Sequence, residues 1–258
     1  MKAEVLFEYL ESQYPLDSAE GWDNVGLLIG RRTADITTVL VALDLTEQIL
    51  EQAVAMQADL IVTHHPLLFS AIKRIESQSF PGAKLLRLIE HTIAAYAVHT
   101  NFDIHKMGEL NAQALQLLDA QPLQRVAQLE PLGFGKVGNL AKPMVLHEFA
   151  EHVKRGLGMD HVLVYGDAGL LVERAAVLGG SGKSAVSDAL QNGAQVLVTG
   201  DIDHHTAQDA KEQGLALIDA GHFGTEYCFV KYMVHALKER FPTLNVLSGS
   251  AENPRTVV

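Results

Sequence analysis

The stretch Leu60-Ile61-Val62-Thr63-His64-His65-Pro66 decides the fold, because a short apolar run ends abruptly in two histidines and a proline. A run of four apolar or β-branched residues bounded by turn-forming residues predicts a buried β-strand. The arrangement has a loose echo later in the chain, where the run 196–199 is followed by Gly200-Asp201 and then by His204-His205. We therefore expect two strands whose carboxyl ends present histidines.

Outward from these two strands, short apolar runs alternate with amphipathic segments. Strands are expected at 37–43, 60–63, 93–98, 161–165, 174–178, 196–199 and 216–219, and helices at 46–57, 84–91, 146–157, 184–192, 206–213 and 224–238. This alternation is typical of βαβ units and predicts an α/β fold. The echo between the two halves predicts two related α/β lobes that face each other, with mixed sheets flanked by helices.

The domain boundary is expected where the texture of the sequence changes. After about Leu118 the chain becomes rich in Gln and Pro, and the segment 133–138 is rich in glycine. We place the first lobe at residues 1–125 and the second at 126–258. The C-terminal helix, at about 224–238, is one element that can pack back on the first lobe.

Composition narrows the class of protein. The formal net charge of −11 argues against a broad nucleic-acid-binding face, which needs a basic stripe. The single cysteine, Cys228, excludes an internal disulfide and a thiolate cluster. The first 22 residues do not read as a secretory signal, and no apolar run approaches the roughly 20 residues that span a bilayer. We expect a cytoplasmic protein without a membrane partner.

Metal-type side chains gather after successive strands. His64 and His65 end one strand, His99 and Asp103 follow the next, and His222 follows a third with Glu226 four residues later. In open α/β sheets the carboxyl ends of strands aim side chains into one crevice. Imidazole and carboxylate suit Zn, Fe, Mn or Co, and five such ligands suit two ions that share a bridging carboxylate. The sequence thus predicts a dinuclear site in the crevice between the lobes.

Each of these residues also has an ordinary structural interpretation. A lone histidine after a strand is usually a loop residue or a cap, and a doublet before proline can be a rigid turn. The glycine-rich segment 179–184 resembles a phosphate-binding loop, but Val177 stands where that motif requires its first glycine. We interpret it as a strand-to-helix turn, whose backbone or Lys183 can still meet an anion.

Six segments together resemble a known family, the dinuclear-metal-centre proteins called GTP cyclohydrolase I type 2 homologues (the NIF-three-like family), in its short bacterial form. The segments are 21–27, 59–68, 98–103, 179–182, 198–205 and 220–226. The resemblance implies two α/β lobes, a toroidal homohexamer, and two divalent ions per subunit held by His64, His65, Asp103, His222 and Glu226. The chain departs from the family at 107–111, where a glycine pair is common, but this is not a ligand segment.

The leading functional hypothesis is a metal-dependent hydrolase that acts on a purine nucleotide such as GTP, with His99, His204 and His205 as candidates for proton transfer. The alternative role of these histidines is to orient the metal ligands by hydrogen bonds without binding the ion, and this is the favoured role for Asp201. Two other functions share the same ligands. One is a metal-binding scaffold or regulatory ring without turnover, and the other is a metallophosphoesterase or amidohydrolase.

Overall fold

The computed structural model describes residues 1–250 and 253–256, and the chain divides into two compact units. One unit combines Met1–Phe102 with Phe229–Val258, and the other is Asp103–Cys228. The division therefore lies at Phe102/Asp103, and not near residue 125 as the change in composition suggests. The reason is that helix α5 (Gly108–Ala114) packs against strands β6 (Gly133–Val145) and β8 (Leu171–Ser181) of the second unit.

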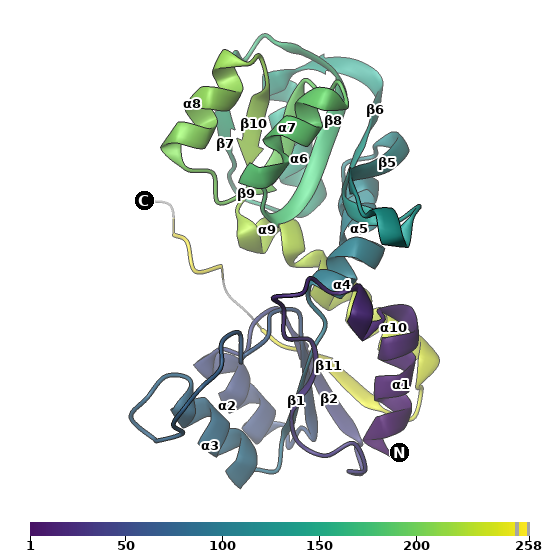
Figure 1. The fold of residues 1–258 in the computed structure, drawn as a ribbon, viewed down its shortest axis with the longest axis vertical. Coiled ribbons are helices and arrows are strands. Elements are labelled where there is room, and N and C mark those ends of the chain that lie inside the picture. The colour runs from purple at the N-terminus through teal and green to yellow at the C-terminus, as the bar shows by residue number, and fades with distance from the viewer. Residues whose placement is uncertain (251–252, 257–258) are drawn as a thin grey trace. The chain divides into compact units, whose positions relative to one another are not determined.

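The first unit is built on a five-stranded mixed sheet in the order β1-β4-β3-β2-β11 (Figure 1). Four strands are parallel, namely β2 (Thr38–Ala42), β3 (Leu60–Thr63), β4 (Ala94–Ala97) and β11 (Asn245–Ser248). The edge strand β1 (Gly26–Ile29) runs antiparallel to β4. The inner strands β3 and β4 are buried along their whole length, which explains why their sequences are nearly continuous apolar runs.

Helices cover both faces of this sheet. Helices α2 (Glu47–Ala55) and α3 (Gly82–Glu90) lie on one side, and α1 (Ala3–Gln13) and α10 (Cys228–Arg240) lie on the other (Figure 1). Helix α2 begins where the Thr46 side chain accepts a hydrogen bond from the Ile49 amide. Its buried face joins the core that covers one side of β2 and β3.

The second unit carries a six-stranded mixed sheet in the order β5-β6-β8-β9-β10-β7. The parallel strands are β8, β9 (Val196–Gly200) and β10 (Ala216–Asp219), and the antiparallel strands are β5 (Leu118–Arg125), β6 and β7 (Leu163–Tyr165). One face packs on α5 and α6 (Leu146–Leu157), and the other packs on α7 (Val186–Gln191) and α8 (His204–Glu212). Both units thus have the predicted arrangement of mixed sheets flanked by helices.

The helix expected at 224–238 is two helices in the structure. Helix α9 (His222–Glu226) belongs to the second unit, whereas α10 continues into the first unit from Phe229. The carboxyl ends of the parallel strands in each unit lead directly into the residues singled out above. Within the described ranges, every helix is too short or too polar to cross a bilayer.

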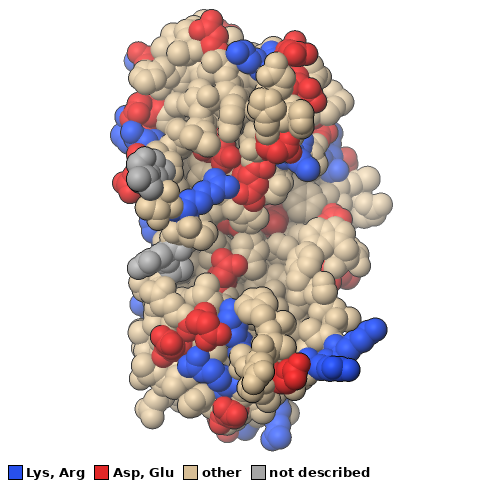
Figure 2. Space-filling model, turned by 90° about the vertical axis from the view of Figure 1, so that its left-hand side faces the viewer, with Lys and Arg blue, Asp and Glu red and all other residues tan. Residues whose placement is uncertain are grey.

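Charged side chains are interspersed on the face shown in Figure 2, where acidic and basic groups alternate over short distances. The described residues in this view form no continuous basic stripe.

Candidate metal centre

Three histidines meet at the carboxyl edge of the first unit's sheet. His64 and His65 follow β3, and His99 follows the neighbouring parallel strand β4, whose Ala97 pairs with Thr63. The ring centroids are 4.9 Å apart for His64 and His65, 5.1 Å for His64 and His99, and 5.4 Å for His65 and His99. One nitrogen from each ring lies within 4.8 Å of the other two, so a single cation could be reached by all three.

Each ring of this histidine cluster is oriented through the same nitrogen. The Nδ1–H of His64 donates to the Val98 carbonyl at 2.9 Å, that of His65 to Asp44 Oδ1 at 2.8 Å, and that of His99 to Asp23 Oδ1 at 2.9 Å. A carbonyl or carboxylate on one nitrogen fixes the tautomer and makes the other nitrogen the ligating atom. All three rings would therefore coordinate through Nε2.

Asp23 is ionised although its side chain is fully buried. Burial alone would raise the pKa of Asp23, but hydrogen bonds from the His99 ring and from Thr100 outweigh it and hold that pKa well below its usual range. The residue precedes β1, whose first residue Gly26 pairs with Ala97 at the end of β4. The antiparallel edge strand thus delivers a carboxylate to the same edge as the histidines.

The second unit has a comparable group where β8, β9 and β10 end. His222 follows β10 and begins α9, and its Nδ1–H donates to Asp201 Oδ2 at 2.7 Å. Its Nε2 lies 3.1 Å from Glu226 Oε2, one helical turn further on. The Glu226 carboxylate is buried, and it lies beside the ring of His222. This imidazole and carboxylate form a second pair of metal-type ligands.

Gly180 makes room for this pair. Its backbone has φ +68°, and a Cβ at that position would overlap Glu226 Oε1 and lie 3.3 Å from the His222 ring. Its amide donates to the Thr225 hydroxyl at 2.9 Å, which ties the strand end to α9. The glycine in the 179–184 segment therefore serves close approach of the backbone to a carboxylate, in agreement with a strand-to-helix turn.

The remaining candidates of the second unit are Asp103, His204 and His205. Asp103 opens a π-helical turn, Asp103–Met107, that packs against β6. His204 and His205 are exposed in the first turn of α8, after Asp203, which caps the helix by accepting from the Thr206 amide. Among the residues that the structure describes, a carboxylate oxygen of Asp103 lies within 4.8 Å of one of Glu226, whereas neither His204 nor His205 belongs to a close grouping of metal-type side chains.

The sequence patterns did not identify two carboxylates of the site, Asp44 and Asp23. Asp44 comes two residues after β2 ends, so the strand-end rule that found the histidines could have found it. Asp23 lies in the 21–27 segment without any local sign of its role, because its partner His99 is 76 residues away. Both act on imidazoles through Nδ1 and are orienting groups in this arrangement.

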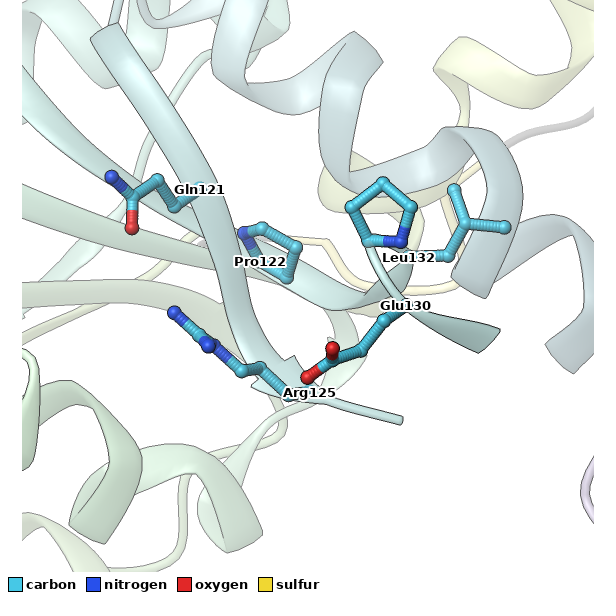
Figure 3. A pocket seen from close by; sticks show the side chains of 6 residues that line it. Gln121, Pro122, Arg125, Glu130 and Leu132 are labelled. Carbon is cyan, nitrogen blue, oxygen red and sulfur yellow. The ribbon is translucent and has the colours of Figure 1, made fainter. Parts of the chain in front are cut away.

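A separate pocket of about 260 Å³ lies in the second unit beside β5 (Figure 3). It is lined by Gln121, Pro122, Arg125, Glu130, Pro131 and Leu132. None of these residues belongs to the strand-end groups, and the lining contains no imidazole. The pocket is therefore not part of the candidate metal centre.

Comparison with known proteins identifies the family. The model of the Duf34/NIF3 (NGG1p interacting factor 3) family matches residues 1–254. The chain belongs to the Duf34/NIF3 family. Among curated Duf34/NIF3 relatives, the GTP cyclohydrolase 1 type 2 homolog of Clostridium perfringens is 36% identical over 264 residues, which cover 98% of each chain. The protein of the same name from Clostridium acetobutylicum is 32% identical over 92% of this chain and 90% of its own.

Solved structures agree with this assignment. The Staphylococcus aureus protein SA1388 is 28% identical with a TM-score of 0.92, covering 100% of this chain and 99% of its own. Reduced HcgD from Methanocaldococcus jannaschii is 30% identical with a TM-score of 0.84, covering 97% of this chain and 98% of its own. The Duf34/NIF3 fold thus extends over the whole chain.

Proposed function

We propose that this Duf34/NIF3 protein holds two divalent metal ions through His64, His65, Asp103, His222 and Glu226, and that it hydrolyses a purine nucleotide such as GTP. One observation carries the proposal. Each of the four imidazoles at the strand ends donates from Nδ1 to a carbonyl or carboxylate of its own unit. Histidines that ligate metals are almost always oriented in this way.

The chemistry of the donor set fits such ions. Imidazole nitrogen and carboxylate oxygen are the ligands preferred by Fe, Zn, Mn and Co, and availability decides among these metals. Five ligands exceed the needs of one tetrahedral ion, and Glu226 or Asp103 can bridge two ions. When bound, ions of this class supply Lewis acidity, which activates water near neutral pH for attack on an electrophilic carbon.

The protein's own residues divide the remaining work. His222 is turned toward Glu226 by Asp201, and His65 is turned by Asp44. His99, held by ionised Asp23, can receive or deliver a proton at Nε2 beside the other two rings of its cluster. The exposed pair His204 and His205 stays a candidate for proton transfer from α8.

The choice of substrate rests on family membership and chemistry. The curated relatives carry the name GTP cyclohydrolase 1 type 2 homolog, which favours a guanine nucleotide whose imidazole ring opens at C8. We also propose a cytoplasmic homohexamer that binds a small molecule and not a membrane.

Metal analysis tests the centre directly. The double variant His65→Ala/Glu226→Ala removes one ligand from each unit and should lower the metal content of the purified protein sharply. The control is His235→Ala/Glu239→Ala, which also removes one His and one Glu, here an exposed pair on α10 whose side chains lie 3.8 Å apart. Equal metal content in the two double variants would contradict the centre.

A nucleotide screen tests the activity. Metal-loaded protein is incubated with GTP, GDP, GMP and their adenine counterparts, and products are separated by chromatography. We expect the wild-type protein to consume a guanine nucleotide and the His65→Ala/Glu226→Ala variant to leave it unchanged. Full metal occupancy without consumption of any nucleotide would leave the metal-binding scaffold as the function.

A further inference from the structure

Two aromatic side chains stand exposed beside the histidine cluster of the first unit. Trp22 is 56% exposed and Phe69 is 55% exposed, and their ring centroids lie 5.5 Å apart with planes tilted by 45°. Both rings also contact His99, at centroid distances of 6.0 Å for Trp22 and 6.3 Å for Phe69, in edge-on geometry. We call Trp22 and Phe69 the aromatic pair.

The backbone on which the aromatic pair stands is fixed. Asp23, next to Trp22, is held by His99 and Thr100. The side-chain amide of Asn24 donates to the carbonyl of Leu68, which precedes Phe69. The turn that carries one ring is thereby tied to the segment that carries the other. Two large apolar rings are kept in water by anchored neighbours, an arrangement that favours a ligand over a loosely packed loop.

The same segment also carries positive charge. Lys73 and Arg74 follow Phe69 by a few residues and are exposed, in a chain whose net charge is −11. An exposed aromatic pair with two cations four and five residues further along the chain suits a ligand with a flat aromatic ring and an anionic group. Bases stack on indole and phenyl rings, and phosphates pair with lysine and arginine.

We propose that Trp22 and Phe69 bind the base of a nucleotide by stacking, with Lys73 and Arg74 meeting its phosphates, and thereby hold the nucleotide beside His99. This inference rests on the function proposed above, since it names how that substrate is held. It assigns recognition to the segments 21–24 and 68–74, and it leaves the chemistry to the strand-end residues. A second copy of the chain covering the same rings is the competing occupant.

Trp22 is the only tryptophan in the chain, so its fluorescence reports on this surface alone. The full-length protein is titrated with guanosine, GMP, ribose 5-phosphate and inorganic tripolyphosphate. We expect guanosine and GMP to quench the emission, GMP at lower concentration, and the two ligands without a base to leave it nearly unchanged. Equal quenching by tripolyphosphate, or no quenching by guanosine and GMP, would overturn the inference.

Matched variants locate the effect on the pair. Phe69→Leu keeps the apolar volume and removes the ring. Phe80→Leu makes the same change later in the same connection, where the Phe80 ring is 83% exposed and contacts Lys84 rather than Trp22. Phe69→Leu should weaken GMP binding roughly 5- to 50-fold, as loss of a stacking partner does, and Phe80→Leu should not. Calorimetry with Trp22→Phe and Trp22→Ala checks the second ring, with the phenylalanine variant retaining more affinity. Equal GMP affinity in the two leucine variants would remove Phe69 from the platform.

The outcomes separate this inference from the proposed function. Quenching by GMP without turnover of any nucleotide retains the stacking site and removes the hydrolase. Metal-dependent turnover of a substrate without an aromatic ring, with no quenching by GMP, retains the hydrolase and removes the stacking site. Emission that changes on dilution in step with dissociation seen by sedimentation, and not with GMP, would assign the pair to contact between copies.

Discussion

His64-His65 follows a buried parallel strand, whereas His204-His205 opens helix α8 with both side chains exposed. In the first doublet each Nδ1 has a partner brought from another strand end, Val98 for His64 and Asp44 for His65. In the second doublet the nearby carboxylate, Asp203, caps the helix backbone. Two identical dipeptides therefore differ in whether the fold directs their rings through Nδ1, as it does for histidines that ligate metals.

The doublets themselves give the largest expected difference. His64→Ala/His65→Ala should lower metal affinity by at least about 100-fold, because loss of even an outer hydrogen-bond partner typically costs 10- to 100-fold. His204→Ala/His205→Ala should leave metal content unchanged. Elemental analysis of the two proteins, purified side by side, makes the comparison. Equal loss from both would mean that the orientation of the rings does not decide binding.

The carboxylate beside each doublet gives the next difference. Asp44→Asn weakens the hold on the His65 ring and lowers its basicity, so metal affinity should fall about 10- to 100-fold. Asp203→Asn should have no effect on metal affinity, because asparagine also caps helices. Competition with a chromogenic chelator measures both affinities. An Asp44→Asn protein with wild-type affinity would show that Asp44 only neighbours the ring.

Two glycines extend the comparison from side chains to backbone. Gly180 and Gly158 have nearly the same φ, +68° and +69°, but a Cβ at Gly180 would meet Glu226 and His222, whereas one at Gly158 meets nothing within 4 Å. Alanine at either position should cost about 1–2 kcal/mol of stability through left-handed strain. Only Gly180→Ala should also weaken metal binding, by about tenfold, because it displaces a carboxylate.

Thermal unfolding and chelator competition on the same two glycine variants separate the effects. Similar melting temperatures with different metal affinities would confirm that Gly180 serves the approach to Glu226. Unchanged affinity in Gly180→Ala would mean that Glu226 moves aside without consequence and is not a ligand.

The best predicted elements are those whose burial requires a regular pattern of apolar residues in the sequence. Helix 146–157 and strands 60–63 and 216–219 have the expected bounds, because one apolar face or an unbroken apolar run marks them. Strand β5 was missed because its residues are mostly exposed and polar and include Pro122. Strand β11 is a four-residue edge strand whose position beside β2 depends on contacts with residues 200 positions earlier.

The candidate site was predictable in its residue types but not in its orientation. The rule that strand ends carry ligands located His64, His65, His99 and His222. The groups that hold these rings lie 34, 21, 76 and 21 residues away in the chain, and no local pattern connects them. The sequence also did not reveal that His204 and His205 are exposed, because a His-His doublet after a strand gives the same pattern whether a loop or a helix follows.

The smallest expected effect is on how the free energy of unfolding depends on acid, compared between Asp23 beside the histidine cluster and Asp203 before the second doublet. The pKa of Asp23 is depressed by hydrogen bonds from His99 and Thr100 in a buried position, and that of Asp203 by hydrogen bonds from Thr206 in an exposed one. A carboxyl whose pKa is lower in the folded protein stabilises the fold at pH values above its unfolded pKa of about 3.9, and this stabilisation is lost as pH falls toward the folded pKa.

Urea unfolding of Asp23→Asn and Asp203→Asn between pH 6 and pH 2.5 compares the two carboxylates. The stability gap between wild type and Asp23→Asn should be constant above about pH 5 and close below about pH 4. The gap for Asp203→Asn should be small throughout, because water screens an exposed carboxylate. A wild-type acid profile in Asp23→Asn would mean that Asp23 is not the ionised anchor of the histidine cluster.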